Sequence, residues 1–470
     1  MDPQAIAPFD LRRTKLVGPA TADQIIADVI ELGWPVGHVL GSEAELLKRY
    51  GISRAVLREA VRLVEHQRVA RMRRGPGGGL IIDEPDIDTV ISAIVLHLLR
   101  IDATLDEVID ARVVVEELVA EIVANRITED AVHSIRETLR DEAAGPWPSD
   151  RMLHAHLAAL TTNPLLDLFV NVLTRIGEFF YVRDSTTISP RLRREAARAH
   201  EQIAQAVLAN NSGLARIRMR RHLLAEADFV RRQGAAVQRL PASVALHGAE
   251  SDKRAEAVAR SIFANIVNDG LLPGAFVGSE PTLMAQQQAS RAVLREAVRL
   301  LDYHHVASMR RGPGGGLFVE APDASALTDI VAIYLRRRGV SADHVVEVLV
   351  GLEVAVVDRV ADRLTGHDAE PVAATLRSYL DRGSAEETVT GVSWHSMLAS
   401  LTGNRAVEIL HRVTMSLGWL FFSRMAESDP SVWRLNEPSA VGPAHRGITE
   451  ALLAGDRELA TMRMRSHRTP

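Results

Sequence analysis

The sequence reads Ser53-Arg-Ala-Val-Leu-Arg-Glu-Ala-Val-Arg-Leu-Val64, and it repeats this stretch almost unchanged as Ser290-Arg-Ala-Val-Leu-Arg-Glu-Ala-Val-Arg-Leu-Leu301. A second block, Met72-Arg-Arg-Gly-Pro-Gly-Gly-Gly-Leu80, recurs at the same offset as Met309 to Leu317. Two blocks at one offset indicate a tandem duplication of a unit about half as long as the chain. We call the two halves copy one and copy two.

The first block has the pattern of a helix with one apolar face and one basic face. Ser53 is placed to cap this helix, and the arginines on its polar face are Arg54, Arg58 and Arg62. Two helices are expected before it, over 21–34 and from Ser42, where Ser42-Glu-Ala-Glu45 matches a capping box. Strands are expected over 69–73 and 80–83, joined by a glycine-rich turn. Helix, helix–turn–helix and two-stranded wing together predict a winged helix-turn-helix.

The composition favours helix for the rest of the chain. Apolar residues make up 47% of the 470 residues but aromatic residues only 4%, so the cores must rest on Leu, Val, Ile and Ala. The predicted fold class is mainly α, with two winged helix-turn-helix domains each followed by an all-helical ligand-binding bundle. The predicted domains are 15–85 and 86–232 in copy one and 251–322 and 323–470 in copy two, with a linker over 233–250.

Composition and charge also limit the function. The chain has no cysteine, which excludes disulfides and thiolate metal sites within it. The most apolar stretch, 90–99, is too short to span a bilayer, and we expect a cytoplasmic protein with no membrane partner. A net charge of −5 means that any contact with nucleic acid must come from local basic patches.

These residues resemble the GntR family of bacterial transcription regulators, in its FadR-like branch. The resemblance is carried by Gly37, by Gly-Ser-Glu at 41–43, and by Ser53-Arg54-x-x-x-Arg58-Glu59-Ala60. It implies a regulator rather than an enzyme, in which a small organic acid bound to the helical domain alters the affinity for double-stranded operator DNA. A metal-dependent enzyme that keeps the winged domains as a scaffold is the alternative.

The expected DNA contacts lie at the start of the repeated helix and in the wing. Arginines four residues apart share one helix face, and a bidentate arginine–guanine pair is the commonest specific base contact. A solvated arginine face on an ordinary helix is the alternative. The candidate DNA-binding residues are Ser53, Arg54, Arg58, Arg73, Arg74 and Gly75 in copy one, and Ser290, Arg291, Arg295, Arg310 and Arg311 in copy two.

Copy two is expected to read DNA less well than copy one. Basic residues outnumber acidic ones less strongly over 279–317 than over 42–80, and Gln288 replaces the turn glycine Gly51. The family often has an arginine after the glutamate of the second helix, where this chain has Ala44 and Pro281. One usual DNA contact is therefore missing from both copies.

A candidate metal site follows from one aspartate and three histidines of copy one. Asp150 and His154 are one helical turn apart, and His200 and His222 lie on later helices, so antiparallel packing could bring all four together. They match the ligand set that the resemblance implies, which suits zinc, nickel or manganese. Surface or core histidines without a metal are the alternative. The resemblance also assigns Arg112 to an effector carboxylate.

Copy two retains only part of this site. His395, His445 and His467 match the three histidines, but Gly391 replaces Asp150 and Leu349 replaces Arg112. A three-histidine metal site remains possible there, without the same effector specificity. Because such regulators usually bind near-palindromic operators as dimers, we expect an intrachain pseudo-dimer. A homodimer of chains with four reading heads is the competing expectation.

Overall fold

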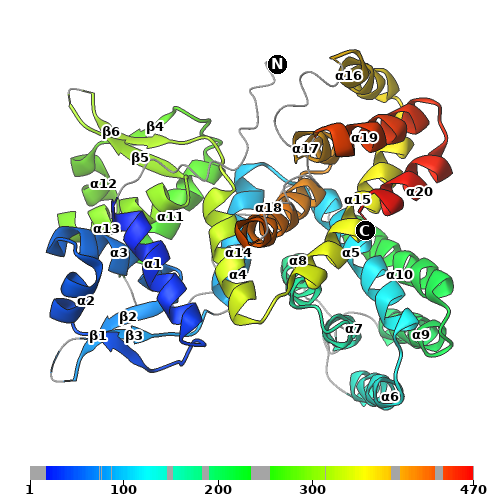
Figure 1. Ribbon diagram of the computed structural model, residues 1–470, viewed down its shortest axis with the longest axis horizontal. Helices are drawn as coiled ribbons and strands as arrows, with labels where there is room; N and C mark the ends of the chain where they lie inside the picture. The colour runs from blue at the N-terminus through cyan, green and yellow to red at the C-terminus, as the bar shows by residue number, and fades with distance from the viewer. Residues whose placement is uncertain are drawn as a thin grey trace. The chain divides into compact units, whose positions relative to one another are not determined.

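The computed structural model describes residues 17–73, 75, 77–85, 87–144, 152–182, 190–233, 254–312, 314–382, 392–428 and 438–468. The fold is mainly α, as expected (Figure 1). The chain divides into two compact units, one formed by 1–94 with 245–339 and the other by 95–244 with 340–470. Each unit therefore combines a part of copy one with the matching part of copy two.

The first unit contains the two winged motifs. Copy one forms α1 (Val17–Glu31), β1 (Val39–Gly41), α2 (Glu43–Tyr50), α3 (Arg54–His66), β2 (Ala70–Arg73) and β3 (Gly79–Ile82). Copy two forms α11 (Arg254–Asn268), β4 (Phe276–Gly278), α12 (Glu280–Gln286), α13 (Arg291–Tyr303), β5 (Ala307–Arg310) and β6 (Gly316–Val319). The sheets are antiparallel, in the orders β1-β3-β2 and β4-β6-β5. The strands β1 and β4 were not expected from the sequence.

The local signals read from the sequence act where they were expected. The Ser42 side chain accepts from Glu45 N while the Glu45 carboxylate accepts from Ser42 N, which completes the capping box of α2. Ser53 caps α3 by accepting from Val56 N. The apolar faces of these helices then meet in one core with α1 and the sheet.

The turn between the second and third helices differs between the copies. Gly51 ends α2 in the left-handed region at φ 63°, where glycine carries no steric penalty. Gln288 occupies the equivalent position and adopts the same region at φ 47°. A side chain there costs about 1 kcal/mol relative to glycine, so copy two makes the same turn with backbone strain.

Copy two also contributes to the core of the first winged motif. Ile333 lies on α14 (Ser325–Arg337), and it belongs to the same buried cluster as Ile25 and Leu57 of copy one. Arg337, further along α14, donates to Glu84 Oε1 at 3.3 Å. The apolar core of copy one is thus completed by a residue of the other copy.

The second unit is built from helices alone. Copy one supplies the last part of α4 (Ile87–Arg100), then α5 (Leu105–Asn125), α6 (Glu129–Ala144), α7 (Met152–Leu160), α8 (Pro164–Val182), α9 (Pro190–Leu208) and α10 (Ser212–Gln233). Copy two supplies α15 (Ala342–Leu364), α16 (Ala369–Arg382), α17 (Val392–Leu401), α18 (Arg405–Ser428), α19 (Pro438–Leu453) and α20 (Arg457–Arg468). The expected linker falls outside the described residues, except for Gln233 at the end of α10.

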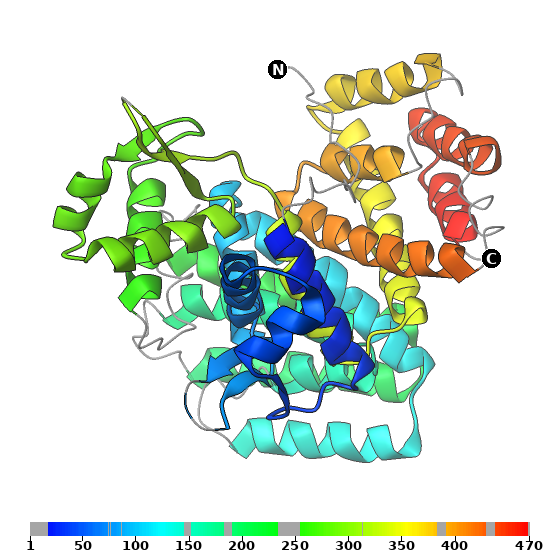
Figure 2. The same cartoon turned by 60° about the vertical axis from the view of Figure 1, so that its left-hand side comes forward.

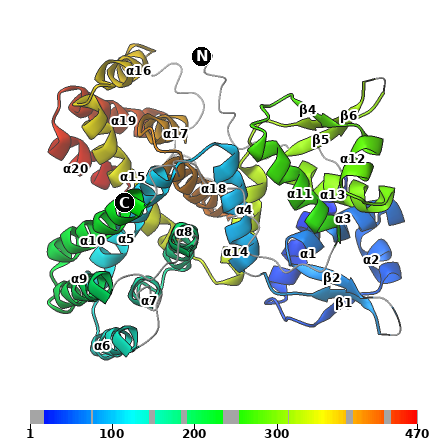
Figure 3. The same ribbon diagram turned by 180° about the vertical axis from the view of Figure 1, so that it is seen from behind.

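Each bundle is arranged around one long helix. The helix α5 packs against α7, α8, α9 and α10, and α10 lies along it (Figure 3). The helix α15 is in the same position in copy two, where the orange α18 crosses the yellow α15 (Figure 2). Residues on α5 can therefore reach α7, α8, α9 and α10, and residues on α15 can reach α16 to α20.

The two bundles contact each other through α5, α8, α15 and α18. Asn163, at the start of α8, donates to Glu347 Oε2 of α15 at 3.0 Å. Asn404, at the start of α18, donates to Asp110 Oδ2 of α5 at 2.9 Å. Asn163 also donates to His344 O of α15, and Asn404 also donates to Glu107 O of α5. Each carbonyl lies one turn before the carboxylate that the same asparagine contacts. The joint therefore has approximate twofold symmetry at these hydrogen bonds.

Within the described residues, no helix combines the length and the apolar character needed to cross a membrane.

We expect Gly51→Gln to lower the free energy of unfolding by about 1 kcal/mol, because a side chain would enter the left-handed region. Gly51→Asn is the matched control and should cost clearly less, because asparagine tolerates that region. Chemical denaturation monitored by circular dichroism measures both. Equal losses for Gln and Asn would show that the backbone conformation is not the cause.

Candidate functional site

The arginines on the polar face of α3 are accessible to solvent. Arg54 and Arg58 are exposed on α3, opposite the buried face that includes Leu57 and Ala60. The nearest acid to Arg54 is Glu43, whose Oε1 lies 3.7 Å from the guanidinium Nε. Because both side chains are exposed and start at the capped end of α3, they can reach a surface placed against that end.

The wing of copy one supplies one more exposed guanidinium. Arg73 Nη2 donates to Gly77 O at 2.8 Å, which fastens its side chain across the turn. Gly75 is exposed and has φ 100°, a conformation that needs glycine. Arg74 lies outside the described residues.

In copy two, the equivalent arginines of α13 share a carboxylate. Glu280 Oε1 lies 3.4 Å from Arg291 Nε and 3.0 Å from Arg295 Nε. Ser290 caps α13 just as Ser53 caps α3. In the wing, Arg310 packs its guanidinium 4.3 Å from the centre of the Phe318 ring, and Arg311 is exposed. The two copies thus carry the same arginines in different electrostatic surroundings.

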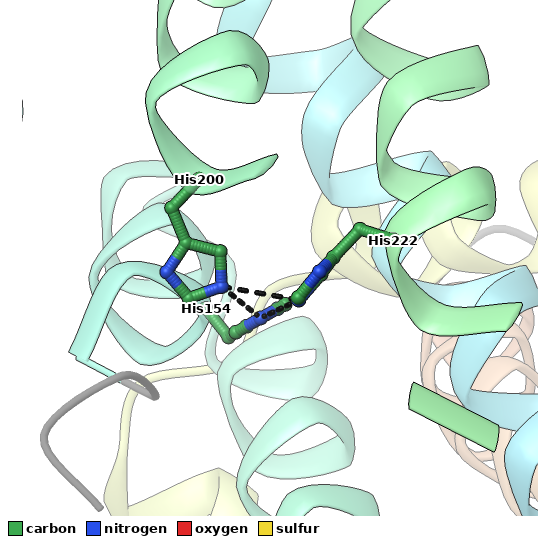
Figure 4. A group of neighbouring side chains, drawn as sticks. All are labelled: His154, His200 and His222. Atoms are coloured by element: carbon green, nitrogen blue, oxygen red, sulfur yellow. Dashed lines mark hydrogen bonds between the residues drawn. The ribbon is translucent and has the colours of Figure 1, made fainter. Parts of the chain in front are cut away.

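Three histidines of copy one meet inside the helical bundle (Figure 4). His154 comes from α7, His200 from α9 and His222 from α10, and all three are buried. Their Nε2 atoms are separated by 3.2 Å for His154 to His200, 3.2 Å for His154 to His222 and 3.0 Å for His200 to His222. Asp150, the fourth expected ligand, lies outside the described residues.

Two glutamates bind the outer nitrogens of these rings. Glu116 on α5 contacts His154 Nδ1, and Glu142 Oε2 on α6 lies 2.9 Å from His200 Nδ1. A carboxylate at Nδ1 holds the proton on that nitrogen, which leaves the Nε2 lone pair free for a metal. Burial lowers the pKa of His222 to about 3, so its ring is neutral, as a metal ligand must be.

The spacing of the three Nε2 atoms fits a bound divalent transition metal. Zn–N bonds of about 2.0–2.1 Å place tetrahedral ligand nitrogens about 3.4 Å apart and right-angled ones about 3.0 Å apart. The observed separations of 3.0–3.2 Å lie within that range. With their protons on Nδ1, His154 and His200 can only accept hydrogen bonds at Nε2. The three Nε2 atoms therefore cannot all be paired with one another by hydrogen bonds. A divalent metal ion held between the three rings would accept all three Nε2 lone pairs.

Arg112 lies beside the triad between two carboxylates. Its Nε donates to Glu116 Oε1 at 2.5 Å, and its Nη1 donates to Glu226 Oε2 at 2.8 Å. Burial raises the pKa of Glu116, but Arg112 and His154 outweigh this and hold it at about 2. Glu226 also approaches His222 Nε2, at 3.7 Å. Its carboxylate is therefore between the arginine and the triad.

The three glutamates of this site were not predicted from the sequence. Glu116 lies one turn after Arg112 on α5, and Glu226 lies one turn after His222 on α10. Their i, i+4 spacing from Arg112 and His222, which were predicted site residues, could have indicated both glutamates. Glu142 has no such signal, because only the packing of α6 against α9 brings it to His200.

Copy two has a second triad with different surroundings. His445 Nε2 lies 3.1 Å from His467 Nε2, which lies 3.4 Å from His395 Nε2. Glu353, the equivalent of Glu116, is 2.8 Å from His395 Nδ1. The Trp394 ring stacks on His445, with centres 4.1 Å apart. Gly391 lies outside the described residues.

The side chain next to Glu353 also differs. Leu349 is buried at the position of Arg112, and His411 Nε2 on α18 lies 3.5 Å from Glu353 Oε1. The second site therefore has three convergent imidazoles and a buried carboxylate, but no guanidinium at the equivalent position.

A family model described as the FCD domain matches the chain twice, over residues 107–225 and 344–469, which together make up just over half of it. These residues include both histidine triads and both central helices, α5 and α15, apart from their first residues.

One curated relative is the Uxu operon regulator of Haemophilus influenzae, 25% identical over 150 residues. The match covers 30% of this chain and 54% of the relative, so the chain spans about half the length of the curated relative it matches. The relative's printed function is regulatory, which agrees with the expectation of a regulator and not an enzyme.

Among solved structures, a Streptococcus agalactiae GntR is similar at 23% identity and a TM-score of 0.35, over 46% of this chain and all of that one. The E. coli protein McbR/YncC is similar at 14% identity and a TM-score of 0.25, over 46% of this chain and 98% of its own. At these TM-scores neither likeness bears on function.

We expect Glu116→Gln to weaken metal binding by copy one about 10–100-fold, because the carboxylate that orients His154 is lost. The affinity is measured on the full-length chain, purified without a tag, by competition with a chromophoric chelator. The Glu116→Gln variant and the reference chain both carry His445→Ala, so that the copy-two triad does not contribute to the measured affinity.

Glu117→Gln serves as the control, because Glu117 is paired with Arg220 and does not touch the triad. Equal affinities for the Glu116 and Glu117 variants would contradict the role assigned to Glu116.

Proposed function

The chain belongs to the FCD-domain family of GntR-type regulators, and on that premise we propose that it is a ligand-controlled transcription regulator. It binds double-stranded operator DNA through its winged motifs and responds to a small organic acid held in the copy-one bundle. We place it in the FadR-like branch and attribute its two halves to a tandem duplication. The observation that carries the proposal is that exposed recognition arginines and a buried three-histidine site occur in one chain.

The proposed DNA contacts follow from the geometry of α3 and its wing. A helix of this kind enters the major groove with its N-terminal residues at the base edges. Arg54 and Arg58 start from that end and are exposed, and two guanidinium groups four residues apart can address neighbouring base pairs. Arg73 of the wing is in place for the phosphate backbone, as Arg310 is in copy two.

We expect Arg54→Ala and Arg58→Ala each to cost about 1–3 kcal/mol of operator binding and to relax the base preference. Arg73→Ala should weaken binding to all sequences alike and reduce the slope of affinity against salt. Fluorescence anisotropy with operator and scrambled duplexes at several salt concentrations separates the two effects. An Arg54→Ala variant with unchanged affinity and preference would remove α3 from the recognition surface.

The second reading head is proposed to be the weaker one because Glu280 competes for its arginines. DNA must displace the Glu280 carboxylate from both Arg291 and Arg295 before they can contact bases. Exposed ion pairs of this kind contribute about 0.2–1 kcal/mol, so the competition lowers affinity without preventing binding. The operator should therefore be an imperfect inverted repeat with one half-site read more strictly.

We expect Glu280→Gln to tighten operator binding about 2–5-fold, because the two arginines lose their shared acceptor. Glu296→Gln on α13, the helix that carries Arg291 and Arg295, is the control, with the same change of charge. Binding is compared on operators mutated in one half-site at a time. If the two variants improve affinity equally, general charge explains the gain, and the competition by Glu280 is wrong.

For the effector, we propose an acid that binds at the copy-one triad with Arg112 as its anchor. The metal, when bound, supplies a positive charge that attracts a carboxylate, and Arg112 adds a fork of donors beside it. Glu226 already bridges Arg112 and His222, so an effector carboxylate would exchange with it. Such an exchange would release Glu226 on α10, next to the central helix α5. Copy two has Leu349 in place of the anchor, so we assign it no equivalent acid ligand.

We also propose that one chain forms an intrachain pseudo-dimer. The Asn163 and Asn404 hydrogen bonds between the bundles support this, as does the entry of Ile333 from copy two into the core of copy one. Linking the copies raises the effective concentration of the second head to about millimolar. Light scattering should give the mass of one chain; a stable two-chain particle at nanomolar concentration favours the homodimer instead.

A further inference from the structure

The joint between the two helical bundles is not symmetric in its side chains. Gly351 on α15 lies against Leu118 on α5, and a Cβ added to the glycine would come within 2.7 Å of Leu118 Cδ1 and 3.1 Å of Cγ. The Leu118 side chain therefore occupies space that only a glycine leaves open. The whole branched end of the leucine would have to move to admit any other residue.

The repeat shows what would stand at these positions in a different pairing. Val114 of α5 is equivalent to Gly351, and Ala355 of α15 is equivalent to Leu118. Two copy-one bundles joined in the same way would set Leu118 against Val114 at both contacts, which overpacks the joint. Two copy-two bundles would set Ala355 against Gly351 at both, which leaves cavities. Both outcomes are destabilising.

An ion pair makes the same distinction independently. Arg405, at the start of α18, binds Glu107 of α5 through Nε and Nη2, both at 2.8 Å, and its Nη1 donates to Ile101 O at 2.8 Å. Burial raises the pKa of Glu107, but the bonds from Arg405 outweigh this, and the pKa lies below its usual range. The carboxylate is therefore charged when it is partly buried in the joint.

The equivalents of this pair cannot form it. Pro164 stands at the position of Arg405 in copy one, and His344 stands at the position of Glu107 in copy two. A copy-one pair would leave Glu107 facing a proline. A copy-two pair would place Arg405 opposite a histidine whose Nδ1 accepts the hydrogen bond of its own helix cap. Losing one partner of a partly buried ion pair costs more than the pair contributes when intact.

From these two contacts we infer that the joint is heterospecific: the α5 face of copy one accepts the α15 face of copy two and rejects a second copy of itself. The occupant of each face is thus the other half of the chain, and bundles of two chains do not exchange through like faces. This inference rests on the proposed intrachain pairing and adds the residues that decide its specificity. The asparagine bonds are common to both copies and hold the two bundles together without selecting between them.

The test exchanges the faces within the full-length chain, which mimics each like-with-like pair. Gly351→Val with Ala355→Leu gives α15 the copy-one residues and should lower Tm by about 3–10 °C through overpacking. Val114→Gly with Leu118→Ala gives α5 the copy-two residues and should also lower Tm, through cavities. The approximate twofold symmetry of the joint sets Val114 opposite Ala355, so all four changes together restore one large and one small residue at each contact. This fourfold variant should recover to within about 2 °C of the unchanged chain.

Calorimetry on the unchanged chain, the two double variants and the fourfold variant measures the energetic coupling between the α5 face and the α15 face. Losses that simply add in the fourfold variant, or no loss in the Gly351→Val and Ala355→Leu variant, would overturn the inference. If that variant fails to fold, Gly351→Ala is compared with Gly213→Ala. Gly213 is a helical glycine where an added Cβ meets only Asn211 Oδ1, at 3.9 Å. A loss at Gly351 alone supports the inference, and equal effects at both glycines overturn it.

Light scattering on the same samples separates this inference from the proposed pseudo-dimer. A one-chain mass with additive Tm losses rejects heterospecificity and leaves intrachain pairing in place. A two-chain mass with full recovery in the fourfold variant supports heterospecificity, and it shows that copy one of one chain pairs with copy two of another.

Discussion

The helical unit depends on keeping a row of buried polar side chains paired with one another. Arg112, Glu116 and His154 follow one another across the copy-one bundle, and each is less than a tenth exposed. An unpaired charge at that depth would cost several kcal/mol. The helices that carry these groups, α5 and α7, are therefore fixed in register with each other. The position of the histidine rings follows from that register.

The central helix α5 serves the site and the joint at the same time. Arg112 and Glu116 point to the histidine triad, whereas Glu107, Asp110 and Leu118 meet copy two. A rotation or shift of α5 that rearranged one set of contacts would disturb the other. A single helix therefore links the surroundings of the histidine triad to the contacts between the two copies.

Because both copies lie in one chain, they can differ from each other. In a homodimer, any substitution at the joint appears on both sides at once. Leu118, which lies against Gly351 here, would then meet Val114 of the second subunit. Joined copies remove this constraint, because each face always meets the other. The same freedom applies to the triads, where copy two lost the guanidinium of Arg112 and gained Trp394 against His445. It applies to the winged motifs, where Gln288 replaces the turn glycine Gly51.

Features that depend only on neighbouring residues along the chain could be predicted from the sequence. Caps at Ser42 and Ser53, the left-handed turn at Gly51 and the arginine face of α3 all arise within one or two helical turns. Such features are set by local backbone geometry, so a pattern of residues is enough to predict them. The repeat likewise predicted two copies of each motif.

Contacts between residues far apart in the chain could not be predicted from the sequence, and they are known from the tertiary structure alone. Three histidines could be selected from the sequence, but the convergence of their Nε2 atoms required α7, α9 and α10 to pack at fixed angles. Glu142 at His200 and Leu118 against Gly351 have no local signal, because their partners are set by helix packing. The third strand of each wing was also missed. Strands of three residues have too little pattern to detect, and β1 and β4 form only because β3 and β6 offer an edge to pair with.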